Sequence, residues 1–298
     1  MGQEIDGKSV NEWANLAVQN FETGNLKEAI NCFSKVLELY PEHVDILNNV
    51  GVAYSKLKDY ENAIKTYEKI VKINPKDRDA LQNIGVFYSK LGDPKKAIEF
   101  LEKANEIEPN KDILFNIAVL CQKLEDIPKA IKVYEEIRKT NPNDVPVLKN
   151  LGTIYMGKRK FDEALDCFGR IIKIDPKEHV AYYNTGIAYD KRKKYLTAIR
   201  SFDNAIKLNP NDPSYWNDRG WAHSNGGKYE KALADYDEAI KLDPNMDKAW
   251  FNRGLTLNNM DNIEDSIIAF EKVLTLKPDL REAKNQLVLL KKALKKRE

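Results

Sequence analysis

Polar side chains of one kind recur at an almost constant interval along this chain. The members are Asn15, Asn49, Asn83, Asn116, Asn150, Asn184, Asp218 and Asn252, and they are 34 residues apart except for one interval of 33. A primary amide carries both a donor and an acceptor, so it can bond the N–H and the C=O of an extended peptide at once. Asp218 only accepts. The column predicts a row of side chains that grips a peptide backbone whatever the peptide sequence.

Other chemistry has little support in the sequence. Gly2, Gly7, Lys8 and Ser9 satisfy the spacing of a phosphate-binding loop, but that loop needs a buried strand before it, and only Met1 precedes Gly2. The histidines and cysteines lie in separate parts of the chain, without the spacing of metal ligands. They are His43, His179, His223, Cys32, Cys121 and Cys167. We therefore expect no enzyme activity, no metal and no cofactor.

A row of prolines recurs with the same period as the amide column and marks the limits of the structural units that carry it. These are Pro41, Pro75, Pro109, Pro142, Pro176, Pro210, Pro244 and Pro278. A fixed period of this length is typical of stacked structural units. Within each period, apolar residues recur at helical spacing in two stretches, with short polar capping residues between them. The proline ends the second stretch, because it has no N–H and clashes with the preceding turn. Each period therefore predicts two helices joined by a turn.

Two further columns predict how the helices pack. A small residue lies 24 positions before each proline: Ala17, Gly51, Gly85, Ala118, Gly152, Gly186, Gly220 and Gly254. A large residue lies eight positions before it: Phe33, Tyr67, Leu101, Tyr134, Phe168, Phe202, Tyr236 and Phe270. Small residues let helix axes approach, and large side chains fill the facing grooves.

This pattern resembles the tetratricopeptide repeat, whose signature is W-x2-L-G-x2-Y, then A-x3-F, then P. Residues 44–77 show it as Leu47, Val50, Gly51, Tyr54, Ala63, Tyr67 and Pro75. The resemblance implies an all-α, right-handed superhelix (an α-solenoid), with first helices on the concave face and second helices on the convex face. We expect a polar leader at 1–9, eight repeats within 10–280 and a capping helix at 281–298. The repeats are 10–43, 44–77, 78–110, 111–144, 145–178, 179–212, 213–246 and 247–280.

The resemblance offers two interpretations of the amide column. In several long superhelices of this family, an asparagine at this position holds the backbone of a bound peptide. Asparagine is also the residue that the family favours there without a known ligand, so both interpretations stay open. Neighbouring positions on the first helices place Tyr183, Trp221 and Phe251 near the column. Exposed aromatic residues are frequent anchors of recognition, although packing against the next first helix is the alternative for each ring.

Two groups in this part of the chain are expected to be structural. Arg219 and Arg253 occupy an otherwise apolar column, and a buried guanidinium group needs a carboxylate, for which Asp235 is the candidate. His223 falls in a tyrosine column, where a packed imidazole is expected.

Composition limits the class of partner. The net charge is +2, with 32% charged residues, which argues against a nucleic-acid surface. The odd number of scattered cysteines favours a reducing compartment, and no apolar run is long enough to span a membrane. We expect a cytoplasmic protein, a monomer in preference to an oligomer, with no membrane or nucleic-acid partner.

Together these features predict a non-catalytic scaffold or adaptor that binds a protein or an extended peptide segment in its groove. The peptide-binding candidates are the eight members of the amide column with Tyr183, Trp221 and Phe251. The alternatives are a self-associating structural module and a substrate-recognition subunit for a separate enzyme.

Overall fold

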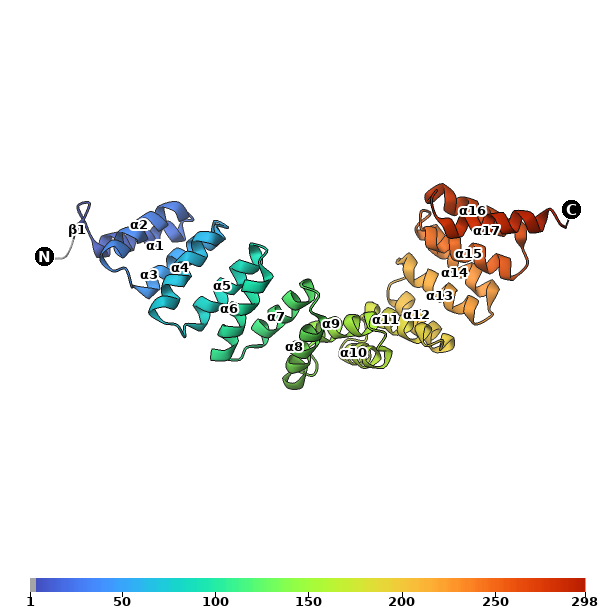
Figure 1. The fold of residues 1–298 in the computed structure, drawn as a ribbon, viewed down its shortest axis with the longest axis horizontal. Coiled ribbons are helices and arrows are strands. Elements are labelled where there is room, and N and C mark those ends of the chain that lie inside the picture. Colours follow the sequence, from blue (N-terminus) through green and yellow to red (C-terminus); the bar gives the residue numbers. More distant parts are fainter. Residues whose placement is uncertain (1–3, 298) are drawn as a thin grey trace. The chain divides into compact units, whose positions relative to one another are not determined.

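The structure, a computed structural model, describes residues 4–297. Apart from one short β hairpin, the regular elements in this range are α-helices. They form two compact units, residues 1–142 and 143–298. Within each unit, helical hairpins lie beside one another in chain order (Figure 1). The expected all-α fold of repeated hairpins is confirmed.

The first unit contains a β hairpin and four helical hairpins. Its elements are β1 (Glu4–Ile5), β2 (Lys8–Ser9), α1 (Val10–Glu22), α2 (Leu26–Leu39), α3 (Val44–Lys56), α4 (Tyr60–Ile73), α5 (Arg78–Lys90), α6 (Pro94–Ile107), α7 (Lys111–Lys123) and α8 (Ile127–Thr140). The two strands pair antiparallel, Glu4 with Ser9 and Ile5 with Lys8.

The second unit contains four further hairpins and one unpaired helix at the C-terminal end. Its helices are α9 (Val145–Gly157), α10 (Phe161–Ile174), α11 (His179–Lys191), α12 (Tyr195–Leu208), α13 (Pro213–Asn225), α14 (Tyr229–Leu242), α15 (Asp247–Asn259), α16 (Ile263–Leu276) and α17 (Arg281–Leu294). The odd-numbered helices up to α15 are the first helices of their hairpins, and the even-numbered helices are the second. The last helix, α17, packs against α16.

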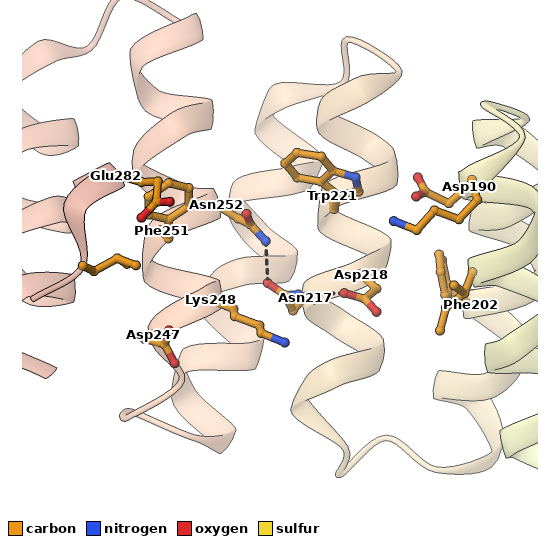
Figure 2. Close-up of a pocket in the computed structure, with 13 residues that line it drawn as sticks. Asp190, Phe202, Asn217, Asp218, Trp221, Asp247, Lys248, Phe251, Asn252 and Glu282 are labelled. Atoms are coloured by element: carbon orange, nitrogen blue, oxygen red, sulfur yellow. Dashed lines mark hydrogen bonds between the residues drawn. The ribbon is translucent and has the colours of Figure 1, made fainter. Parts of the chain in front are cut away.

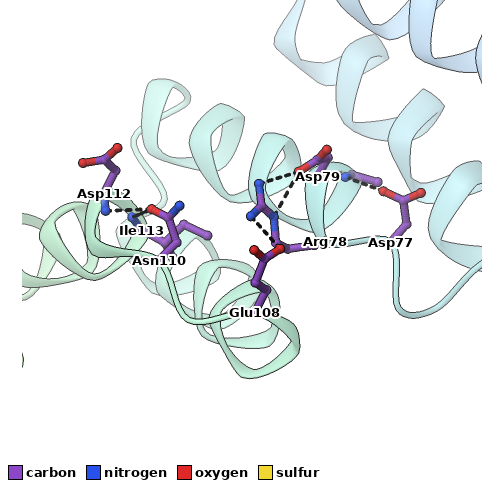
Figure 3. Close-up of polar contacts among 8 residues, drawn as sticks. Asp77, Arg78, Asp79, Glu108, Asn110, Asp112 and Ile113 are labelled. Atoms are coloured by element: carbon purple, nitrogen blue, oxygen red, sulfur yellow. Dashed lines mark hydrogen bonds and ion pairs between the residues drawn. The ribbon is translucent and has the colours of Figure 1, made fainter.

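Short polar side chains fix the helix ends, as the sequence indicates. Asp59, Asp93, Asp126 and Asn262 each accept a backbone N–H at the start of a second helix, whereas Asn25 makes no such bond. Figure 3 shows the same N-terminal capping on first helices, where Asp77 caps α5 and Asn110 caps α7. Each repeat proline lies two residues beyond the end of a second helix. These contacts satisfy N–H groups that the first helical turn leaves without a partner.

The small and large columns pack against each other within each repeat. An added Cβ at Gly186 would lie 2.5 Å from Cε1 of Phe202, and one at Gly51 would lie 2.5 Å from Cε2 of Tyr67. Both distances are too short for non-bonded carbon atoms, so the two helices approach this closely only because the first helix carries glycine. The packing expected from these columns is confirmed.

Ion pairs on the surface link neighbouring hairpins. In the first unit, the guanidinium group of Arg78 at the start of α5 bonds Asp79 at 2.8 Å and Glu108 after α6 at 3.0 Å (Figure 3). In the second unit, Nζ of Lys149 lies 2.6 Å from Glu178. Exposed pairs of this kind contribute about 0–1 kcal/mol each, so the apolar columns dominate the packing.

The described part of the expected polar leader is folded. Residues 4–9 form the β hairpin, with positive φ angles at Asp6 and Gly7 that suit a tight two-residue turn. Nε1 of Trp13 donates to the carbonyl of Ile5 at 2.8 Å, and Ser9 caps α1. Ser9 of the phosphate-loop pattern thus has a structural role, and Gly2 lies outside the described residues.

The first helices meet directly in the second unit. Helix α13 contacts both α11 and α15, its counterparts in the preceding and following repeats. The faces of these three helices therefore form one surface, and this surface carries the site described next.

Candidate functional site

A pocket of about 460 Å³ opens on the first helices of the second unit. Its walls come from α11, α13 and α15, with Phe202 of α12 and residues at the start of α17 (Figure 2). Four of the predicted peptide-binding residues line it: Asp218, Trp221, Phe251 and Asn252. A cavity that combines apolar side chains with polar groups that can orient a ligand is the usual form of a binding site.

Trp221 differs from the other three tryptophans of the chain. The indole N–H groups of Trp13, Trp216 and Trp250 each donate to a backbone carbonyl, at 2.8, 2.8 and 3.1 Å. Within residues 4–297, the indole N–H of Trp221 has no hydrogen-bond partner, and the side chain is 37% exposed. The first three are fixed structural members of the repeat, whereas Trp221 offers its ring and its donor to the pocket.

A directed chain of hydrogen bonds runs along one wall of the pocket. Nδ2 of Asn252 donates to Oδ1 of Asn217 at 3.0 Å, and Nδ2 of Asn217 donates to Oδ1 of Asp218 at 2.8 Å. From the other side, the hydroxyl of Tyr183 donates to Oδ2 of Asp218 at 2.7 Å. Asp218 therefore accepts at both oxygens, which an asparagine at this position could not do.

The surroundings of Asp218 change its protonation equilibrium. Burial raises the pKa of its carboxyl group, and the bonds from Tyr183 and Asn217 and the charges of Lys248 and Lys191 offset only part of this rise. The pKa of the Tyr183 hydroxyl is also raised, first by burial and then by the charge of Asp218. The hydroxyl group therefore stays protonated and keeps its role as donor.

Carboxylates outnumber cations around the pocket. Asp190, Asp218, Asp247 and Glu282 line it together with Lys191 and Lys248. Asp247 already forms an ion pair with Lys277 at 2.8 Å. Oδ1 of Asp190 is buried and has no hydrogen-bond partner, and burial raises the pKa of this carboxyl group. In Figure 2, the carboxylate of Asp190 is turned toward Trp221 of the neighbouring helix.

The members of the amide column fall into three groups. Within the described residues, the side chains of Asn15, Asn49, Asn83 and Asn116 make no hydrogen bond. Nδ2 of Asn150 and of Asn184 each donates to a carbonyl of its own helix, at 3.0 and 2.8 Å. Each of these two amides keeps one N–H and the carbonyl oxygen for a ligand. Asp218 and Asn252 belong to the network in the pocket wall.

Tyr183 does not line the pocket. Its ring is half-buried and packs on Tyr215 of the next first helix, with ring centroids 4.6 Å apart, and on Phe202 at 5.8 Å. Tyr183 thus makes the contact with the next first helix that the packing alternative describes. Phe251 also packs on a second-helix ring, that of Phe270, with centroids 5.4 Å apart, but one side of it remains on the pocket.

The structural expectations for this region hold for Arg219 and His223, whereas the partner of Arg253 differs from the expected one. Arg219 forms two bonds to Asp235, at 3.0 and 2.5 Å, and Arg253 bonds Asp237 at 2.9 Å instead of Asp235. His223 is buried, and burial lowers the pKa of its imidazole group. Arg219, His223 and Arg253 belong to the first helices α13 and α15 but do not line the pocket.

Sequence reasoning missed several charged and polar members of the pocket. Asn217 directly precedes Asp218, and its column is mostly filled by unrelated residue types. Asp190 and Lys248 belong to no regular column that could have marked them, whereas Lys191 shares its column with Lys56, Lys90 and Lys123. They meet only because the first helices of three repeats are adjacent.

Comparison with known proteins identifies the repeats. Family models described as tetratricopeptide repeat match residues 9–76, 145–178, 179–212, 213–246 and 247–280. The chain belongs to the tetratricopeptide repeat family. A further model, described as anaphase-promoting complex, cyclosome, subunit 3, matches residues 56–137. No curated protein sequence matches significantly.

Solved structures with the tetratricopeptide fold resemble the chain at low sequence identity. The crystal structure of MamA is 25% identical and covers 54% of this chain and 95% of its own, with a TM-score of 0.52. The C-terminal part of a TPR repeat-containing protein from Cytophaga hutchinsonii is 18% identical, covers 80% of this chain and 98% of its own, and has a TM-score of 0.65. A chain of the APC/C hetero-tetramer Cut9–Hcn1 is 16% identical. The match covers 92% of this chain and 54% of that chain, with a TM-score of 0.51.

Two further findings concern membranes and metals. No described helix of this tetratricopeptide protein is both long enough and apolar enough to cross a bilayer. Residues 4–297 contain no group of three histidine, cysteine or acidic side chains arranged to hold a metal ion.

Proposed function

We propose that this tetratricopeptide protein is a non-catalytic adaptor that binds an extended segment of a partner protein along its first helices. The pocket of the second unit anchors the segment, and the amides of Asn150 and Asn184 hold its backbone. The observation that carries the proposal is Trp221, which presents an exposed ring and an unbonded indole N–H beside Phe251. Tryptophan is among the residues most enriched in binding hot spots.

The surroundings of Asn184 support the role of the amides. Asn184 lines a second, smaller pocket of about 140 Å³ with Lys149 and Thr153, on the α9–α11 side of the same unit. Its carbonyl oxygen can accept an N–H from a peptide, and its remaining N–H can donate to a peptide carbonyl. Each such bond contributes about 1 kcal/mol net, so the backbone contacts add to the aromatic anchor and do not replace it.

The family and its solved members are consistent with this proposal. Cut9 and Hcn1 are described together as a hetero-tetramer, so that tetratricopeptide relative associates with another protein. Similarity at this level of identity supports the fold, and the choice of partner here depends on the residues of the pocket.

Selection of peptides from a random library tests the proposal. Random dodecapeptides displayed on phage are panned against the full chain, and selected peptides are synthesised for titration. In ¹H–¹⁵N spectra, binding should shift the indole signal of Trp221, assigned with Trp221→Phe, more than those of the other three tryptophans. Trp221→Ala should weaken binding about tenfold or more, as expected for loss of a large apolar contact of about 1.5–3 kcal/mol.

Amide variants separate backbone gripping from general binding. Asn150→Ala and Asn184→Ala should each weaken binding about fivefold, because each removes a bond of about 1 kcal/mol. Asn204→Ala is the matched control, since Asn204 is an exposed asparagine on the second helix α12. Failure to select any peptide, or unchanged affinity in Trp221→Ala, would contradict the proposed function.

A further inference from the structure

We propose that the pocket between α11, α13 and α15 selects a basic side chain, with arginine preferred, on the partner segment. This inference rests on the proposed function and names the chemistry of the ligand. The juxtaposition that carries it joins Trp221 and Asp218, which both belong to α13, with Asp190 of the preceding first helix α11, and all three line the pocket.

Unpaired negative charge lines the pocket. Among the described residues, neither Asp190 nor Asp218 forms an ion pair, and neither Lys191 nor Lys248 lies within ion-pair distance of them. Both lysines are exposed, so water solvates their ammonium groups. An arriving cation therefore gains attraction from two carboxylates that no protein cation neutralises directly.

A buried acceptor in the pocket has no donor. Oδ1 of Asp190 is inaccessible to solvent and makes no hydrogen bond. Leaving such an atom unsatisfied is unfavourable. Because the oxygen is closed to water, a ligand N–H would reach it after rotation of the Asp190 side chain, and the hydrogen bond gained then favours a donor-rich ligand group.

Asp218 has acceptor capacity left after its bonds within the chain. A carboxylate has about four lone-pair positions, and Tyr183 and Asn217 use one on each oxygen. These two donors also hold the carboxylate in one orientation. The group is therefore fixed before the ligand arrives, which lowers the entropic cost of binding.

The aromatic ring favours arginine over lysine. A guanidinium group stacks on an aromatic face and directs five N–H donors in a plane, so it can stack on Trp221 while it donates to a carboxylate of the pocket. An ammonium group is a compact, strongly hydrated charge and would lose more solvation in the same place.

The experiment uses the random dodecapeptide library and the full chain. We expect the selected peptides to be enriched in a single arginine or lysine at a shared position. For one arginine peptide, a matched peptide with citrulline has nearly the same shape and no charge. The arginine peptide should bind about tenfold to hundredfold more tightly, in line with a hydrogen bond between charged groups.

A variant of Asp190 gives the decisive comparison. Asp190→Asn removes the charge at a side chain whose Oδ1 makes no bond, so no hydrogen bond to this atom is lost. It should weaken the arginine peptide about tenfold and leave the citrulline peptide unchanged. Glu230→Gln is the control, because Glu230 is an exposed carboxylate on the second helix α14 and does not line the pocket.

The outcomes separate this inference from the proposed function. Selected peptides that shift the Trp221 signal but lack basic residues would overturn the inference and leave the proposed function intact. An equal loss of affinity for the arginine and citrulline peptides in Asp190→Asn would also overturn the inference. If no peptide is selected, the proposed function itself fails, and the inference fails with it.

Discussion

The hydroxyl of Tyr183 donates to Oδ2 of Asp218 across 2.7 Å, between the first helices of two successive repeats. Asparagine occupies the position of Asp218 in the other seven repeats. A second donor explains why this repeat has a carboxylate here: Nδ2 of Asn217 donates to Oδ1 of Asp218 at 2.8 Å. An asparagine would turn its own NH₂ group toward one of the two donors. Asp218 is thus the acceptor that joins the hydrogen bonds of the pocket wall.

Removing the Tyr183 hydroxyl should destabilise the second unit. Tyr183→Phe keeps the ring packing but leaves Oδ2 of Asp218 without its donor, at a cost of about 1–3 kcal/mol. Chemical denaturation measures this cost. Tyr182→Phe is the matched control, because the Tyr182 hydroxyl makes no hydrogen bond in the described part of the chain. Equal effects of the two substitutions would argue against a role for the bond to Asp218.

The stability contribution of Asp218 should depend on pH. Burial raises its pKa in the folded state, so folding favours the protonated carboxyl group. This favourable contribution is complete below the pKa of the unfolded chain and is lost as the pH rises through the raised folded value. Asp218→Asn cannot ionise, so its denaturation midpoint should improve relative to the parent between pH 3 and pH 7. A difference between the two proteins that does not change with pH would contradict this prediction.

Close packing of the small and large columns predicts opposite effects at two glycines. Gly186→Ala places a Cβ 2.5 Å from Phe202, and this overpacking should cost about 1–3 kcal/mol. At Gly169, inside α10, nothing lies within 4 Å of the added Cβ. Gly169→Ala should therefore stabilise the chain by up to about 1 kcal/mol, because alanine favours the helix. Thermal unfolding of both variants checks the sign of each effect.

Two arginine–aspartate pairs in consecutive repeats should differ in their importance. Asp235 has 6% of its side chain exposed, so Asp235→Ala leaves a largely buried Arg219 without this partner, at a cost of about 3–5 kcal/mol. Asp237 is 59% exposed, and Asp237→Ala should cost only about 0–1 kcal/mol. Denaturant titrations of both variants measure the two costs. Similar losses would show that burial does not separate the pairs.

Repetition made the fold readable from the sequence. Each proline and capping residue acts within one or two turns of helix, and each glycine acts on the second helix of its own hairpin. The proline recurs in all eight repeats, so these signals reinforce one another. The pairing of Gly186 with Phe202 could be predicted because both belong to columns with a fixed offset. Trp221 and Phe251 were also predicted near the amide column, since a residue's place on a helix face follows from its spacing.

The chemistry of the pocket was only partly readable, because it depends on residues outside the columns. Nothing in the sequence marks Asp190 or Lys248 as neighbours of Asp218. The hydrogen bonding of the amide column could not be predicted either. In the described structure, the side chains of Asn49 and Asn83 make no hydrogen bond, whereas Asn252 bonds Asn217.

The sequence alone determined the repeat, the helix ends and the residues that face along the first helices, because these depend on interactions over a few residues. Tertiary structure decided which of those residues meet. Contacts of α13 with α11 and α15 bring Tyr183, Asp218 and Asn252 into one network, although they are separated by 34 or 35 residues. The physical reason is that hydrogen bonding and burial depend on distances across helices, which a periodic sequence does not specify.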